Sequence, residues 1–285
     1  QSMMTAAALG AGLALPVSAQ SSSPAFSASP EGSRAGKTPK MPVYPIPQKM
    51  TRSGGSVTVP ALKLLGARDE PTVNALKSMF SLAPNGLPVQ MIIIKGSKKP
   101  AGNVPRKAGA YSLNVTPQGI RMTGYDDEGL FYAAQTLLQL AEKTSSGVTV
   151  PEVEVLDWPD VPFRGTIEGF YGLPWAQEGR ISQFKFYGKY KMNTYIYGPK
   201  DDVFHGFSKR WREPYPADMA KDLKELVKVA KQNKVNFVWA VHPGADIHWG
   251  ETDRKAAVKK FEMMYDLGFR SFAVFFDDIG GEGAK

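Results

Sequence analysis

The sequence of 285 residues contains no cysteine and only three histidines. The lack of cysteine excludes disulfides, thiolate zinc sites and a cysteine nucleophile. No Gly-x-Ser-x-Gly segment is present, so a serine hydrolase with a nucleophile elbow has no support. The phosphate-binding glycine fingerprint is missing after every predicted strand, which disfavours a nucleotide-binding function. We therefore expect neither a cofactor nor a bound metal.

The net charge of +8 raises the question of a nucleic-acid partner. The lysines between 221 and 231, however, alternate with acids and apolar residues, which is typical of a solvated helix face. We therefore expect no nucleic-acid partner. Attraction to an acidic polysaccharide or an anionic surface is the alternative explanation of the charge.

The first 19 residues read as part of a signal peptide. Residues 3–19 are apolar and uncharged and end in Val17-Ser18-Ala19, a small-residue cleavage site. The run is too short and broken to span a membrane. We expect a secreted or periplasmic protein. Residues 20–50, rich in serine and proline, are expected to form a disordered linker.

Residues 51–158 predict a small α+β domain without catalytic features. Strands are expected at 57–59 and 91–94, helices at 69–82 and 128–143, and a hairpin over 111–122. Asp126 or Asp127 is the expected cap of the second helix.

Residues 159–285 alternate strand and helix patterns. Strands are expected at 163–171, 194–197, 237–241 and 272–276, and helices at 176–190, 217–231 and 252–267. This alternation favours parallel strands joined by helical crossovers. The pattern alone permits either a doubly wound sheet or a barrel.

Polar residues follow each of the four strands, where such folds carry their chemistry. They are Glu168 and Tyr171, then Lys200, Asp201 and Asp202, then His242, and finally Asp277 and Asp278.

The acidic pair is the strongest candidate for catalysis. An apolar strand delivers Asp277 and Asp278 together, and retaining glycosidases need two carboxyl groups about 5 Å apart. Neighbouring carboxylates also raise the pKa of one partner, which suits a general acid. This requires both side chains to turn into one pocket, because successive residues of a regular strand face opposite ways. A helix cap beside a solvated residue, or a Mg²⁺ site, remains open as an alternative.

Three further groups are candidates. Gly169 allows close approach of the backbone to a ligand, and Tyr171 beside it suits stacking on a sugar face; the alternative is a plain turn. Lys200 offers three protons to sugar hydroxyls, unless it pairs with Asp201 at the surface. His242, Asp246 and His248 suggest a metal, but their loop spacing matches no known ligand motif, so a structural or substrate-lining histidine is favoured.

Four segments together resemble glycoside hydrolase family 84, the O-GlcNAcase and hyaluronidase-like family. They are RGTIEGFYGLPW at 164–175, KYKMNTYIYGPKDD at 189–202, FVWAVHPG at 237–244 and FAVFFDDIGGEG at 272–283. The resemblance covers the chain from about residue 157. The preceding segment more loosely resembles the small domain that precedes hexosaminidase barrels.

The resemblance implies a TIM (β/α)8 barrel and a retaining β-N-acetylglucosaminidase acting on a β-GlcNAc glycan or glycoprotein. The 2-acetamido oxygen of the substrate would attack C1, an exception to the covalent-carboxylate route. Asp277 would orient and stabilise the acetamido group, Asp278 would act as general acid and base, and Gly169 and Lys200 would hold sugar hydroxyls.

One departure from the family pattern concerns length. The sequence shows four barrel strands where eight are needed, so we expect residues 20–285 alone to be inactive and poorly soluble. A hyaluronidase-type enzyme and a non-catalytic carbohydrate-binding protein are the alternatives.

Overall fold

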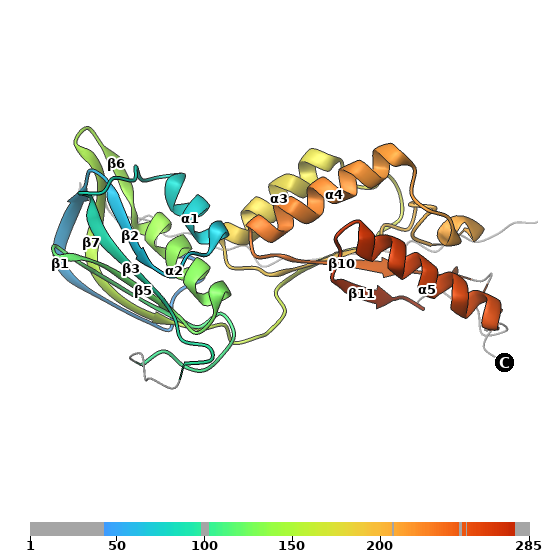
Figure 1. Cartoon of the computed structure of the whole chain (residues 1–285), viewed down its shortest axis with the longest axis horizontal. Helices are drawn as coiled ribbons and strands as arrows, with labels where there is room; N and C mark the ends of the chain where they lie inside the picture. The colour runs from blue at the N-terminus through green and yellow to red at the C-terminus, as the bar shows by residue number, and fades with distance from the viewer. Residues whose placement is uncertain (1–42, 98–102, 207, 245–246, 249, 277–285) are drawn as a thin grey trace, which may run out of the picture. The chain divides into compact units, whose positions relative to one another are not determined.

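The computed structural model describes residues 43–97, 103–206, 208–244, 247–248 and 250–276 (Figure 1). The expected signal segment and most of the expected linker lie outside the described residues, as do Asp277 and Asp278. Residues 43–50, assigned to the linker from sequence, carry structure: Val43 is buried and the first strand begins at Lys49. The proline-rich composition hid this start because prolines are tolerated where a chain enters an edge strand.

The first half of the chain forms a seven-stranded mixed sheet with two helices. Its strands are β1 (Lys49–Val59), β2 (Leu62–Gly66), β3 (Leu87–Ile93), β4 (Tyr111–Thr116), β5 (Gly119–Gly124), β6 (Glu142–Thr144) and β7 (Gly147–Asp157). The helices are α1 (Glu70–Lys77) and α2 (Asp127–Leu140). The strand order is β1-β7-β4-β5-β3-β2, with β6 paired to β7. Apolar residues of the sheet and α2 form one core.

Side-chain caps set where the two helices begin. Asp69 accepts a hydrogen bond from Thr72 N at 3.1 Å, and Pro71 stands in the first turn. Asp126, rather than Asp127, caps α2 by accepting from Gly129 N at 2.9 Å. Both helices end earlier than the sequence indicated, at Lys77 and Leu140. After α2 the backbone becomes extended at Ala141, and the next residues pair with β7 as β6. The sequence did not predict this strand, because a local apolar pattern does not report strand pairing.

The second half forms a four-stranded parallel sheet. Its strands are β8 (Gly165–Glu168), β9 (Thr194–Tyr197), β10 (Asn236–Val241) and β11 (Ser271–Val274). The connecting helices are α3 (Gln177–Lys189), α4 (Ala217–Gln232) and α5 (Glu251–Asp266), with a short 3-10 helix at Lys209–Arg212. A second core, rich in aromatic side chains, joins these helices to the sheet.

The strand order of this sheet separates the two architectures left open by the sequence. The order β8-β9-β10-β11 follows the chain without reversal. A doubly wound sheet reverses its order at a switch point, whereas right-handed crossovers between consecutive neighbours place successive helices on one side. The described strands therefore have the sequential parallel order of part of a (β/α) barrel, in agreement with the expected first four strands. The outer strands β8 and β11 are shorter than expected: β8 ends at Glu168 and β11 at Val274.

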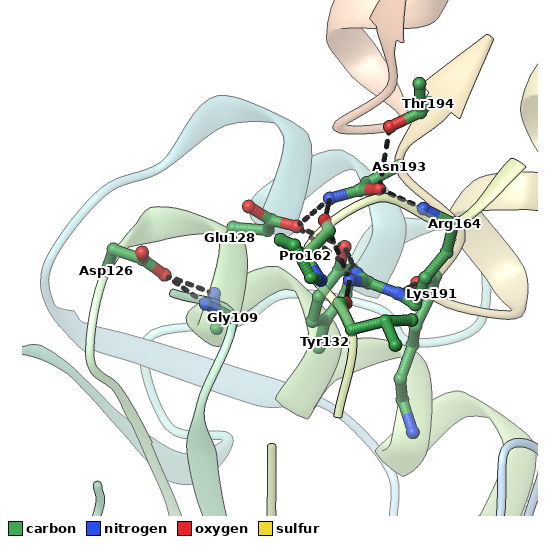
Figure 2. A network of polar contacts seen from close by, with 11 residues as sticks. Gly109, Asp126, Glu128, Tyr132, Pro162, Arg164, Lys191, Asn193 and Thr194 are labelled. Atoms are coloured by element: carbon green, nitrogen blue, oxygen red, sulfur yellow. Dashed lines mark hydrogen bonds and ion pairs between the residues drawn. The ribbon is translucent and has the colours of Figure 1, made fainter. Parts of the chain in front are cut away.

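A polar network joins α2 to the amino ends of β8 and β9 (Figure 2). Arg164 donates to Tyr132 Oη at 2.7 Å and lies 3.5 Å from Glu128 Oε1. Asn193 Nδ2 donates to the same Glu128 oxygen at 3.2 Å, and Asn193 Oδ1 accepts from Arg164 N at 3.0 Å. Glu128 also accepts a short hydrogen bond from Tyr132. The network thus supplies one partly buried carboxylate with donors from α2 and from the segments that precede β8 and β9.

A second contact between the first sheet and the segment that precedes β9 is built around Asp157, the last residue of β7. Its Oδ1 accepts from Gln48 N at 3.1 Å and Trp158 N at 3.0 Å. Its Oδ2 accepts from Tyr111 Oη at 2.9 Å and lies 3.5 Å from Lys191 Nζ. Lys191 has a left-handed backbone, φ 60°, which is uncommon for a residue with a Cβ. Its ammonium group lies 5.3 Å from the Tyr111 ring centre. A buried acid, a tyrosine and a buried lysine thus form one unit.

The Arg164 network leads to a prediction of stability. Arg164→Met leaves Glu128 with fewer donors and should lower the free energy of unfolding by about 1–3 kcal/mol. For a protein of this size that corresponds to a melting temperature lower by about 2–4 °C per kcal/mol, measurable by calorimetry. The matched control is Arg254→Met, because Arg254 pairs with Glu251 on an exposed helix surface. It should change stability by less than about 0.5 kcal/mol. Equal effects of the two substitutions would contradict a structural role of the network.

Candidate active site

The candidate site lies at the carboxyl ends of the four parallel strands. Phe275 N still donates to Val241 O at 2.8 Å, so the chain runs beside β10 for one residue beyond β11. Asp277 and Asp278 follow Phe276 directly in the sequence but lie outside the described residues. The geometry of the site therefore comes from the loops after β8 and β9, which carry Gly169, Tyr171 and Lys200, and from the end of β10, which His242 follows.

Glu168, at the end of β8, is fully engaged by the protein itself. It has no exposed surface. Arg180 donates to it twice, at 2.9 and 2.8 Å, and Tyr195 Oη donates at 2.5 Å. Trp175 N donates to Glu168 Oε1 at 3.0 Å. Since its oxygens are occupied by these donors, Glu168 anchors the 169–175 loop and does not present a free carboxylate to a ligand.

The loops that follow β8 and β9 are hydrogen-bonded to each other. Lys200 N donates to Phe170 O at 3.1 Å, and Gly198 N donates to Glu168 O at 3.0 Å. Asp201 Oδ2 accepts from Gly172 N at 2.8 Å. Gly172 has φ +96°, a conformation that favours glycine. Asp201 therefore fixes the neighbouring loop, a contact that the sequence did not indicate.

These contacts bring together three of the predicted residues. Gly169 and Tyr171 stand on one of the joined loops and Lys200 on the other. Lys200 is only 6% exposed, and its Nζ lies 6.0 Å from the Tyr171 ring centre. Tyr171 is 63% exposed. The arrangement offers a lysine ammonium group beside an open aromatic ring, a combination suited to hydroxyl groups and to the apolar face of a sugar.

His205 and His242 are both fully buried at this end of the sheet. His205 Nδ1 lies 2.6 Å from Ala240 O, and burial lowers the pKa of His205 to about 4, so it is neutral at pH 7. His242 N donates to His205 O at 3.0 Å, which joins the 198–206 loop to the end of β10. His248 N donates to Asp253 Oδ2 at 2.6 Å, and Asp246 lies outside the described residues. Among the residues that the structure describes, no cluster of three His, Asp or Glu side chains fits a metal.

Sequence reasoning missed the partners of Asp202. Its buried carboxylate accepts hydrogen bonds from Tyr197 Oη and Tyr215 Oη, both at 2.7 Å, and from Phe204 N at 2.9 Å. Near Tyr215 lies Lys260 of α5, 1% exposed, with its Nζ 4.5 Å from the tyrosine ring centre. Lys260 Nζ donates to Glu213 O at 2.5 Å. Only the position of Asp202 after a strand gave a signal in the sequence, since Tyr215 and Lys260 come from distant segments.

Two family models match the chain. Residues 164–285 match the family described as beta-N-acetylglucosaminidase, and residues 40–158 match domain 2 of glycosyl hydrolase family 20. Protein O-GlcNAcase from Rattus norvegicus and that from Mus musculus are each 40% identical over 116 residues, which is 40% of this chain and 12% of either rodent protein. A beta-hexosaminidase from Vibrio vulnificus is 38% identical over 80 residues, 28% of this chain and 8% of that protein.

Solved structures show the same relationship. The structure titled CpGH84B has a TM-score of 0.75 and 36% identity over 84% of this chain and 44% of its own. The structure titled CpGH84D has a TM-score of 0.73 and 28% identity over 86% of this chain and 46% of its own. The chain thus spans less than half the length of these relatives.

The family models, the relatives and the fold all relate the chain to glycoside hydrolases. More narrowly, residues 164–285 match the model of the β-N-acetylglucosaminidase family, and the resemblance to glycoside hydrolase family 84 predicted from the sequence is confirmed. The helices of the described residues are all too short or too polar to cross a bilayer.

The buried lysines predict how stability changes with pH. Burial lowers the pKa of Lys191 and of Lys260 from 10.5 to about 8, although Asp157 and Asp202 oppose the shift. Between about pH 8 and pH 10 the unfolded chain therefore binds more protons at these two sites, and stability rises with pH. Above about pH 10 the trend reverses, because burial raises the pKa of Tyr111 and of Tyr215 well above 10.

Urea unfolding at about pH 7.5 and about pH 9.5 measures this effect. The wild-type protein should gain about 2 kcal/mol or more on going to the higher pH. Lys260→Met should remove about half of the gain, whereas Lys255→Met, at an exposed position of the same helix, should leave it unchanged. A gain that persists fully in Lys260→Met would show that Lys260 is not the titrating group.

Proposed function

We propose that the protein containing this chain is a retaining β-N-acetylglucosaminidase of the O-GlcNAcase type, which removes terminal β-GlcNAc with the help of the substrate's own acetamido group. One observation carries the proposal. Within a segment of the β-N-acetylglucosaminidase family, the joined loops after β8 and β9 hold Lys200 beside Tyr171. The adjacent acids Asp277 and Asp278 follow β11, a neighbour in the same parallel sheet.

The proposed chemistry needs two carboxyl groups with different roles. The acetamido oxygen attacks C1 and the acetamido group becomes cationic as an oxazoline forms, so Asp277 stabilises the developing charge and orients the group. Asp278 gives a proton to the leaving oxygen and later takes one from the attacking water. Two carboxylates in one pocket favour this division, because the charge of one raises the pKa of the other.

The described loops supply the recognition of the sugar. Lys200 donates hydrogen bonds to sugar hydroxyls from a nearly buried position, where a charged hydrogen bond is worth about 1.5–3 kcal/mol. The carbonyl of Gly169 accepts from a hydroxyl, and Tyr171 packs against the sugar face. Loops fixed by Glu168 and Asp201 hold these groups before the sugar arrives, which lowers the entropy cost of binding.

The complete catalytic domain is proposed to be an eight-stranded barrel, of which β8 to β11 form the first four strands. The sequential parallel order supports this architecture. The complete enzyme is a polypeptide that carries this whole domain.

The first kinetic prediction separates the roles of the two acids. In the complete enzyme, Asp278→Asn should slow aryl β-GlcNAc substrates with poor leaving groups by about 10²–10⁴-fold, because these need the proton. Substrates with good leaving groups should be slowed much less in the first step. Asp277→Asn should slow both kinds, because acetamide participation precedes departure of either. Measurement of kcat/KM across a series of leaving groups decides this, and equal losses throughout the series for Asp278→Asn would refute its role as the acid.

The second kinetic prediction concerns the acetamido group. The complete enzyme should hydrolyse an aryl β-GlcNAc and leave an aryl β-glucoside of equal leaving-group ability intact. A thiazoline that mimics the oxazoline should inhibit far more strongly than free GlcNAc, because it resembles the intermediate. Comparable kcat/KM values for the two glycosides would rule out acetamide participation. Cleavage restricted to the inside of hyaluronan chains would favour a hyaluronidase-type enzyme instead.

A further inference from the structure

Asp202 is the centre of a buried network beside Lys200. Its side chain is nearly inaccessible, and Oδ2 accepts from two tyrosine hydroxyls, those of Tyr197 and Tyr215. Oδ1 accepts from Phe204 N. Because these donors surround it, the Asp202 carboxylate is held by the protein and does not face the open side of the site.

The network extends from Asp202 into the second core. Trp239 Nε1 donates to Tyr215 Oη at 3.2 Å. The Lys260 ammonium group lies 4.5 Å from the Tyr215 ring centre and 5.6 Å from that of Trp239. A cation near aromatic faces and near a buried carboxylate offsets part of the cost of burying either charge. Strand β10, helix α5 and the loop before α4 therefore all converge on Asp202.

The backbone of Asp202 organises the loop that carries Lys200. Asp202 O accepts from His205 N at 3.0 Å and Gly206 N at 3.2 Å, and Asp202 N donates to Pro199 O at 3.1 Å. Residues 198–206 therefore form a compact loop around the backbone of Asp202, and the Asp202 side chain adds the bond from Phe204 N. Lys200 stands inside this loop, two residues from Asp202, and its own N–H is bonded to Phe170 O.

We propose that Asp202 is a positioning residue: held by Tyr197, Tyr215 and Phe204 N–H, it fixes the 198–206 loop and with it the place where the Lys200 ammonium group meets the sugar. The inference rests on the proposed function, since it gives Lys200 a sugar to bind. A lysine side chain loses about 2 kcal/mol of rotamer entropy when it is fixed. A loop that is already rigid spares the enzyme much of this cost at the moment of binding.

The carboxylate is required in this place because of its number of acceptors. Asparagine has the same shape but offers one oxygen and an NH2 group. If the oxygen serves the two tyrosine hydroxyls, the NH2 group faces Phe204 N–H, and two donors oppose each other. Asp202→Asn therefore breaks the bond to the loop backbone with little change of volume.

The same chain contains a matched control. Asp157, Tyr111 and Lys191 repeat the acid, tyrosine and buried lysine arrangement at the amino ends of the strands, away from Lys200. Asp157→Asn and Tyr111→Phe remove the same chemical groups as Asp202→Asn and Tyr215→Phe. Their losses of stability should be similar, so a difference in function separates positioning from general destabilisation.

The test is a double-mutant cycle on the complete enzyme with an aryl β-GlcNAc substrate. Asp202→Asn should lower kcat/KM by about 10- to 100-fold, mainly through KM. In a Lys200→Ala background the same change should lower it by less than about threefold, because Lys200 is already absent. Asp157→Asn should leave kcat/KM within about threefold of wild type. If Asp202→Asn fails to fold, Tyr215→Phe and Tyr111→Phe replace the pair, since they remove one hydroxyl each.

Hydrogen exchange gives a readout that does not depend on activity. The amides of Phe204 and His205 should exchange faster in Asp202→Asn, or in Tyr215→Phe, and remain as in wild type in the Asp157 and Tyr111 variants. An undiminished effect of Asp202→Asn in the Lys200→Ala background, or unchanged exchange, would overturn the positioning role. A wild-type enzyme that does not cleave β-GlcNAc would instead refute the proposed function, and the exchange data would still show whether Asp202 fixes the loop.

Discussion

A buried carboxylate must be supplied with hydrogen-bond donors. The loops at the carboxyl ends of the parallel strands β8 to β11 depend on that requirement. Each of its acids would be costly to bury alone. Glu168 draws in Arg180, Tyr195 and the backbone of Trp175, while Asp202 draws in two tyrosines and the backbone of Phe204. In each case the donors include a backbone N–H of a loop after a strand. The hydrogen bonds that stabilise the buried carboxylate therefore also fix the shape of the loop.

This requirement explains how short loop segments are held in place at the proposed sugar-binding surface. Loops are ordinarily the mobile parts of a fold, and in the loops after β8 and β9 the rings of Trp175 and Phe204 already pack against neighbouring aromatic rings. Here the acids at their bases anchor them to the sheet, and Asp201 fastens one loop to the other through Gly172 N. The acids available for catalysis are then those that the described network does not consume, and the proposed pair at Asp277 and Asp278 follows a different strand.

Much of the second sheet was predictable because the pattern of each strand and helix lies within one short segment of the sequence. Strand β9 begins and ends where the sequence placed it, at Thr194 and Tyr197, and α3 and α4 agree within one residue. The first sheet was less accessible. Strands β2, β6 and β7 went unpredicted. Strand β2 pairs with β3, and β7 pairs with β1 and β4 as well as with the adjacent β6, and such pairing rather than propensity decides these strands.

The same distinction governs what could be predicted of the site. Gly169, Tyr171 and Lys200 follow the ends of strands, so alternation and strand position were sufficient to select them as candidates. Asp202 stood in the same run, but its role depends on Tyr215 and Lys260, which come from other segments and have no sequence spacing in common with it. Sequence patterns report which side chains reach the site end of the sheet. They do not report which of those side chains are already hydrogen-bonded within the protein. The hydrogen-bond partners give that information, and they distinguish acids that hold the loops from acids that are left for the proposed chemistry.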